Sequence, residues 1–158
     1  MNKNIEFKNN KMIYVSMIIY LCAVIYVTFL LIDFTLDFKW LYHESIPVDY
    51  GNIVPFEDLM KNRGGAVENI VLNILMTILL GFFISIIYIK TNILKIVVKT
   101  FLFSLTIELI QLIMTIFLLY HRACDVTDLI TNTIGGIIGY ITYKLINING
   151  LISKLFIK

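Results

Sequence analysis

Charged residues are scarce in this sequence. Asp, Glu, Lys and Arg together make up 15% of the 158 residues, whereas about a quarter is typical of soluble domains. Proline, cysteine and histidine occur only twice each. The apolar fraction is 59% and the mean hydropathy is +0.86. This composition excludes most soluble enzyme folds and indicates a membrane protein.

Several functional classes lack the residues they need. The net charge is only +2, so no sustained basic surface is available to neutralise nucleic-acid phosphates, and no nucleic-acid partner is expected. Cys22 and Cys124 have neither metal-ligand spacing nor a disulfide framework. No Ser/His/Asp set, nucleophile elbow or phosphate-binding glycine loop is present. The sequence therefore gives no support to nucleophilic catalysis.

Four apolar stretches are long enough, or nearly so, to cross a bilayer, which takes about 20 residues. They cover residues 12–32, 70–89, 96–120 and 129–147. We therefore predict an all-α integral membrane protein, a bundle of about four transmembrane helices that forms a single domain over 1–158. A long, aromatic-rich loop joins the first span to the second.

The basic residues predict the orientation of these spans. Nine lysines lie at the N-terminus, in the gap after the second span and in the C-terminal region: Lys3, Lys8, Lys11, Lys90, Lys95, Lys99, Lys144, Lys154 and Lys158. Because basic residues concentrate on the cytoplasmic side of membrane proteins, both termini are predicted to be cytoplasmic. The two other gaps hold most of the acidic residues and are predicted to face outward.

Glu108 lies near the middle of the third predicted span. An acidic side chain there costs about 2.5–3.5 kcal/mol on insertion scales. At about 100° per residue, it shares one stripe of the helix with Ser104, Gln111 and Thr115. This stripe is predicted to face protein or water and not lipid.

Two further spans carry matching polar faces. The fourth presents Asp125, Asp128, Asn132, Gly136 and Gly139, and the second presents Asn69, Asn73, Thr77 and Gly81. Gly135, Gly136 and Gly139 form a small-residue patch of the kind that packs transmembrane helices closely. We therefore predict that three helices surround one polar pocket that opens toward the outer face.

The candidate pocket residues have structural and functional interpretations, and the sequence leaves both open. Asp125 and Asp128 could cap the fourth helix, or they could hold a hard divalent cation such as Mg²⁺ or Ca²⁺. Glu108 and Gln111 could be hydrogen-bonding links between helices. Arg122 could hold a phosphate through its bidentate guanidinium. No cofactor other than a possible divalent cation is expected. The full candidate set is Glu108, Gln111, Arg122, Asp125, Asp128 and Asn132.

Four motifs in the chain resemble the VanZ-like family of small bacterial membrane proteins. The run H-R-A-C-D-V-T-D-L-I-T-N-T-I-G-G-I-I-G-Y from His121 to Tyr140 is similar to the family signature R-x-x-D-x-x-D-x-x-x-N-x-x-G-x-x-x-G. Glu108 and Gln111 match the E-x-x-Q motif of the family, and Asn52, Pro55 and Phe56 match its N-x-x-P-F motif. Asn73 and Gly81 match the first and last residues of the family's N-x-x-x-F-x-P-x-G helix. Thr77 and Leu79 replace the Phe and Pro of that helix, which predicts a straighter second span.

The resemblance implies an association with low-level resistance to teicoplanin-type lipoglycopeptides, in the plasma membrane of a Gram-positive bacterium. It implies membrane lipids as partners, with a lipoglycopeptide or a lipid-linked cell-wall precursor as a possible ligand. Three hypotheses follow: a non-enzymatic protein that lowers drug susceptibility, a membrane enzyme acting on a lipid-linked phosphate or glycan, and a small transporter that uses Glu108. The sequence does not decide whether the protein is catalytic.

Overall fold

The computed structural model describes residues 10–31, 51–88, 91–118 and 124–149. It divides the chain into two compact units, residues 1–47 with 150–158, and residues 48–149. In the first unit, the helix α1 (Asn10–Ile25) continues into the π-helix η1 (Tyr26–Leu31). The predicted single domain over 1–158 stays a prediction, and the two units are described separately.

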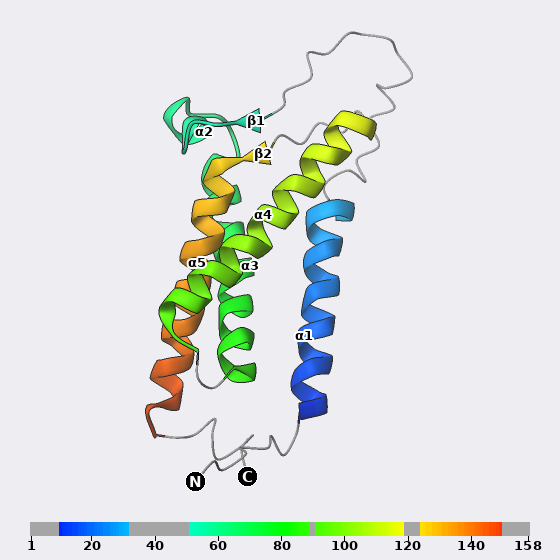
Figure 1. The fold of residues 1–158 in the computed structure, drawn as a ribbon. Coiled ribbons are helices and arrows are strands. Elements are labelled where there is room, and N and C mark those ends of the chain that lie inside the picture. The colour runs from blue at the N-terminus through cyan, green and yellow to red at the C-terminus, as the bar shows by residue number, and fades with distance from the viewer. Residues whose placement is uncertain (1–9, 32–50, 89–90, 119–123, 150–158) are drawn as a thin grey trace. The chain divides into compact units, whose positions relative to one another are not determined.

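The second unit holds the remaining elements (Figure 1). In chain order they are β1 (Gly51–Asn52), α2 (Glu57–Met60), α3 (Ala66–Ile87), α4 (Ile93–Leu118), β2 (Cys124–Asp125), α5 (Val126–Ile146) and the 3-10 helix η3 (Asn147–Asn149). Within this unit α5 packs most extensively against α3 and next against α4.

Among the described residues, three helices are long and apolar enough to cross a membrane: Lys11–Phe29, Ala66–Ile87 and Ile93–Ile116. This confirms the predicted all-α, multi-pass membrane fold. The fourth helix, α5, is less apolar because it is rich in Thr, Asn and Gly, and most of these residues are buried. Its exposed large side chains include Ile134, Ile138, Ile141 and Leu145, which form one apolar stripe at helical spacing. That α5 crosses the membrane stays a prediction, and the stripe is what such a crossing requires.

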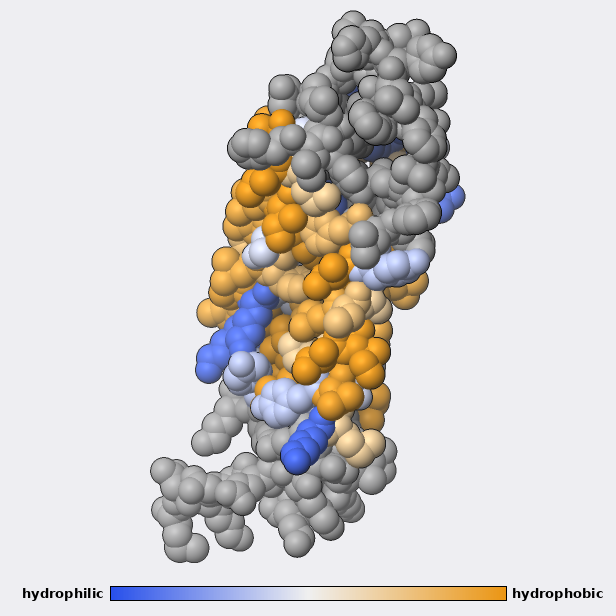
Figure 2. Space-filling model, turned by 90° about the vertical axis from the view of Figure 1, so that its right-hand side faces the viewer, coloured by the Kyte–Doolittle hydropathy of each residue, from blue (hydrophilic) through white to orange (hydrophobic). Residues whose placement is uncertain are grey.

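The polarity of α4 is inverted relative to a helix of a soluble protein. Ser104 is 0% exposed and Glu108 is 1% exposed, whereas Ile113 on the opposite side is 54% exposed. The rest of the predicted stripe, Gln111 and Thr115, is buried as well. Figure 2 shows that apolar residues cover most of the described surface on the side of the molecule that it presents. Only a lipid surrounding makes this arrangement favourable.

Glycines allow α3 and α5 to touch through their backbones. A Cβ atom added to Gly81 would lie 2.1 Å from the Gly136 carbonyl oxygen, and one added to Gly139 would lie 2.0 Å from the Ile78 carbonyl oxygen. On another side of α5, a Cβ atom on Gly136 would lie 2.2 Å from Thr100 Cγ2 of α4. Small residues at these positions are therefore required for α5 to fit against both neighbours.

The two short strands form a parallel pair, with Gly51 opposite Cys124 and Asn52 opposite Asp125. They lie where α5 begins and close to α2 (Figure 1). This pair joins the loop before α3 to the start of α5, although the two segments are far apart in the sequence. We call this part of the second unit, made of β1, α2, β2 and the first turn of α5, the strand end.

Candidate functional site

Glu108 of α4 is a buried carboxylate that contacts the strand end. Its Oε2 atom accepts a hydrogen bond from the backbone N–H of Asp125 at 2.8 Å. The Cys124 side chain also hydrogen-bonds to Glu108. Burial raises the pKa of the Cys124 thiol to about 11, and the neighbouring Glu108 carboxylate raises it further in the same direction. The thiol is therefore protonated at neutral pH and acts as the donor, so Glu108 receives two hydrogen bonds that offset part of its burial cost.

Asp125 is the N-cap of α5. Its backbone is extended, with φ −121° and ψ 123°, and its side-chain Oδ1 accepts a hydrogen bond from Thr127 N at 2.7 Å. An acidic N-cap stabilises a helix by about 1 kcal/mol and suits the positive end of the helix dipole. The capping interpretation is therefore confirmed for Asp125. Asp128 follows in the first turn of α5, where the dipole again favours a negative charge.

One turn deeper, a polar link joins α4 to α5. Asn132 Nδ2 donates to Ser104 Oγ at 2.8 Å, and Ser104 Oγ donates to the Asp128 carbonyl at 3.3 Å. Asn132 is only 2% exposed, and its Oδ1 has no hydrogen-bond partner among the described residues. The stripe on α4 therefore contacts α5 at successive turns, with Glu108 against β2 and Ser104 against the turn from Asp128 to Asn132.

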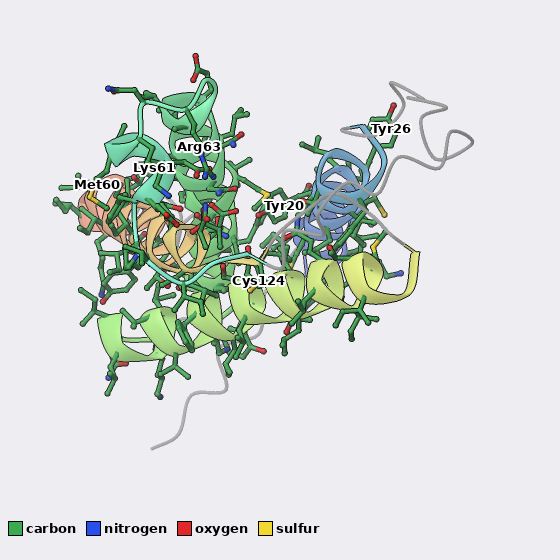
Figure 3. The ribbon with its side chains drawn as sticks, turned by 90° about the horizontal axis from the view of Figure 1, so that it is seen from above. Tyr20, Tyr26, Met60, Lys61, Arg63 and Cys124 are labelled. Carbon is green, nitrogen blue, oxygen red and sulfur yellow. The ribbon has the colours of Figure 1, made fainter. Side chains whose placement is uncertain are left out.

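The N-x-x-P-F loop is held by side chains that the sequence analysis did not single out. Asp58 Oδ1 accepts from Asn52 Nδ2 and from an Arg63 guanidinium nitrogen, each at 2.8 Å. In Figure 3 Arg63 lies over the end of the bundle where α3 and α5 begin, and Cys124 lies between α4 and α5. The only sequence signal for this link is the Asp and Arg spaced five residues apart in a loop, which is weak.

Phe56 adopts a left-handed backbone with φ 59° and ψ 23° at the start of α2. Such a conformation is uncommon for a residue other than glycine and persists where its surroundings hold it. The Phe56 backbone N–H donates to Thr127 Oγ1 at 2.9 Å, so the hydroxyl of the first turn of α5 holds the loop in this conformation. Thr127 lies inside the D-x-x-D motif, but its spacing gives no sign of a partner 71 residues earlier.

The structure brings together most of the predicted site residues. Hydrogen bonds join Glu108 to the Asp125 backbone, and the Asp125 side chain to Thr127, whose hydroxyl accepts from Phe56. Asn52 lies opposite Asp125 in the strand pair, and Asn132 is linked through Ser104 to the Asp128 backbone carbonyl. Gln111 is buried one turn further along α4. Pro55 is exposed. Arg122 lies outside the described residues.

The second-span residues contribute to packing. The Asn73 carbonyl accepts from Thr77 Oγ1 at 2.8 Å, while Asn69 is exposed. Thr77 is buried against Gly135, whose added Cβ atom would lie 2.1 Å from the Thr77 hydroxyl. Leu79 is exposed, and α3 runs without interruption from Ala66 to Ile87, as expected for a span without the family's proline.

The described residues contain no group of three or more His, Cys, Asp or Glu side chains arranged to hold a metal ion. Asp125, one of the two residues considered as cation ligands, uses a carboxylate oxygen as a helix cap. The divalent-cation alternative therefore gains no support from this part of the chain.

These features define a multi-pass helical membrane protein in which the buried Glu108 of one span accepts a hydrogen bond from the backbone that leads into α5. The family model described as VanZ/LLP1 matches residues 17–147. The chain therefore belongs to the VanZ/LLP1 family, and the resemblance seen in its motifs is confirmed. No curated protein and no solved structure matches the chain.

The Thr127 hydroxyl provides a direct test of the strand end. Thr127→Val removes the acceptor of the Phe56 N–H, so we expect the loop from Asn52 to Arg63 to loosen by about 1 kcal/mol. Hydrogen exchange at the Phe56 amide should accelerate, while Thr127→Ser should preserve wild-type exchange. Thr106→Val is the matched control, because the Thr106 hydroxyl bonds only within α4, to the Leu102 carbonyl. Unchanged exchange in Thr127→Val would contradict the link.

Proposed function

We propose that this VanZ/LLP1 protein lowers susceptibility to teicoplanin-type lipoglycopeptides and that it acts through the strand end on the outer face of the membrane. The observation that carries the proposal is the convergence of three family motifs in one hydrogen-bonded cluster. Asn52 and Phe56 come from N-x-x-P-F, Glu108 comes from E-x-x-Q, and Asp125 and Asp128 come from D-x-x-D.

The cluster supports a binding role better than a purely internal one. Its acidic groups lie at the end of the bundle that the lysine distribution predicts to face outward. A lipid-tailed glycopeptide inserts its tail among lipids and places its polar part at this level. The cluster would then alter how the drug or a lipid-linked precursor is presented near the membrane surface.

The test is drug susceptibility of an isogenic Gram-positive host that expresses the protein. Expression should raise the inhibitory concentration of teicoplanin more than that of vancomycin, because vancomycin lacks the lipid tail. The double variant Asp125→Asn/Asp128→Asn should lose this protection. Asn caps a helix about as well as Asp does, so this variant removes charge while it keeps the cap of α5.

The control is Glu68→Gln, which removes an exposed acid in the first turn of α3 and should protect like the wild type. Membrane levels of every variant are measured in parallel. Equal shifts for teicoplanin and vancomycin would refute the proposal for lipid-tailed drugs. Full protection by the double variant would refute a role for the charges of Asp125 and Asp128.

A second candidate is a membrane enzyme that acts on a lipid-linked phosphate or glycan. The gathering of the carboxyl-bearing residues Glu108, Asp125 and Asp128 around the start of α5 favours this alternative. It predicts that the purified protein converts a polyprenyl-phosphate or phospholipid substrate, as detected by mass spectrometry. Absence of turnover across a broad panel of such lipids would count against it.

A further inference from the structure

The opposite end of the second unit has a one-sided charge distribution. There α3 ends, α4 begins and α5 ends (Figure 1). The sequence contains no acidic residue from Asn69 to Ile107 and none after Asp128. This end carries three lysines on its helices: Lys95 and Lys99 of α4 and Lys144 of α5. The parts of α3, α4 and α5 that lie there contain no carboxylate side chain. We call this part, made of Tyr88, residues 91–99, Tyr140 and Lys144, the lysine end.

The two lysines of α4 occupy an electrostatically unfavourable position. Lys95 lies in the first turn of a 26-residue helix that has no acidic residue there, and Lys99 follows one turn later. Cations are disfavoured near the positive end of a helix dipole, and like charges four residues apart repel each other. The Asn92 side chain caps this helix by accepting from Lys95 N at 2.9 Å, but an amide does not neutralise the charge. An anion from outside the chain would remove both conflicts.

Aromatic rings hold the ammonium groups of this end. Lys99 Nζ lies 3.2 Å from the ring centroid of Tyr88, and Lys144 Nζ lies 5.5 Å from that of Tyr140. A cation–π contact positions the ammonium group without cancelling its charge. Lys and Tyr at the end of a spanning helix are typical of the membrane interface, where the ring lies at the depth of the lipid headgroups.

Two neighbouring features fit a ligand that is both polar and apolar. The Thr91 hydroxyl, in the turn before α4, is buried and has no hydrogen-bond partner among the described residues. Beside the lysines, Ile93, Leu94 and Val98 are exposed, and Leu94 reaches 66%. A free anion would leave these apolar side chains uncovered, whereas a lipid would cover them with its acyl chains.

We propose that the lysine end binds the headgroup of an anionic phospholipid, with Lys95 and Lys99 facing the phosphate and the exposed apolar residues of α4 contacting the acyl chains. Tyr88 is a positioning residue that fixes Lys99. Negative charge on the lipid complements the described residues of this end, whose charged side chains are all lysines. The cytoplasmic leaflet, which this end is predicted to face, attracts basic segments of membrane proteins.

The experiment measures binding of phosphatidylglycerol to the full-length protein in a mild detergent, by native mass spectrometry, with phosphatidylcholine as the neutral lipid. We expect preferential retention of phosphatidylglycerol. Lys95→Gln/Lys99→Gln should weaken its binding by about 25-fold, since a basic residue near an anionic lipid surface contributes about fivefold, or roughly 1 kcal/mol. Lys95→Arg/Lys99→Arg should bind like the wild type, because it keeps both charges.

The control variant, Lys61→Gln, removes the lysine that follows α2 and pairs with Glu57, and it should leave phosphatidylglycerol binding unchanged. Folding of each variant is checked by its circular dichroism spectrum. Equal retention of both lipids would overturn the proposal, as would wild-type binding by a folded Lys95→Gln/Lys99→Gln. Full competition by inorganic phosphate at matched ionic strength would identify a free-anion site and overturn the assignment to a lipid.

Discussion

Gly139→Ala is expected to destabilise the protein strongly. The added Cβ atom would lie 2.0 Å from the Ile78 carbonyl oxygen and 2.8 Å from the Phe82 nitrogen, and neither backbone atom can move without shifting α3. Ala in place of Gly gains up to about 1 kcal/mol of helix propensity, but overpacking of a close contact costs about 1–3 kcal/mol. Because the clash involves backbone, we expect the loss to exceed the gain and the unfolding midpoint of the purified protein in detergent to fall.

Gly64→Ala is the control for this prediction. Nothing lies within 4 Å of an added Cβ atom at Gly64, and its φ is not positive, so its unfolding midpoint should remain at the wild-type value or rise slightly. An unfolding midpoint of Gly139→Ala equal to that of the wild type would contradict the close backbone contact between α3 and α5.

A double-mutant cycle tests the other side of α5. Gly136→Ala places a Cβ atom 2.2 Å from Thr100 Cγ2, which is a side-chain atom. Thr100→Ala removes this methyl group and the hydroxyl oxygen at 2.8 Å but keeps Thr100 Cβ, also at 2.8 Å, so it relieves the contact in part. The double variant should therefore be more stable than the sum of the two single effects predicts, since the residues couple directly.

Glu108→Leu is expected to release the start of α5 without unfolding the bundle. The substitution removes the acceptor of the Asp125 N–H, and an unpaired buried donor costs about 1–3 kcal/mol. It also removes a carboxyl group whose insertion costs about 2.5–3.5 kcal/mol. Because these two effects oppose each other, global stability should change little. The local effect is not offset, so hydrogen exchange at the Asp125 amide should accelerate by roughly 10- to 100-fold.

Glu108→Gln separates the hydrogen bond from the charge. The amide oxygen of Gln can still accept from the Asp125 N–H, so exchange at that amide should remain close to the wild type. Glu68→Leu, at an exposed position of α3, serves as the control and should leave the Asp125 amide unaffected. Equal exchange in Glu108→Leu and the wild type would show that Glu108 does not hold β2.

This arrangement bears on the transport hypothesis. An acid in the middle of a span suggests an ion pathway, but in the structure one oxygen of Glu108 accepts from a backbone N–H and the Cys124 side chain bonds to the same carboxylate. The presence of Glu108 inside a span is therefore explained by its hydrogen bond to the Asp125 backbone. Hydrogen exchange at the Asp125 amide in Glu108→Leu tests this explanation.

The sequence by itself determined the membrane class, the positions of the three most apolar helices and the buried polar stripe of α4. Each of these is encoded locally: hydropathy over about 20 residues indicates a span, and the spacing of Ser104, Glu108, Gln111 and Thr115 places them on one side of a helix. The motifs from Asn52 to Tyr140 also indicated the family, because a family signature is read from residue types and their spacing.

Only the tertiary structure decided how the strand end is assembled. The pairing of β1 with β2, the bond from Phe56 to Thr127 and the link of Asn52 and Arg63 through Asp58 have no periodic signal. Two-residue strands are too short to show an alternating pattern. A backbone N–H can come from almost any residue type, so the sequence does not indicate which residue donates to the Thr127 hydroxyl. The strand pair and the bond from Phe56 to Thr127 join segments about 70 residues apart in the sequence, so they depend on the packing of α5 against α3, which Gly81 and Gly139 allow to be close.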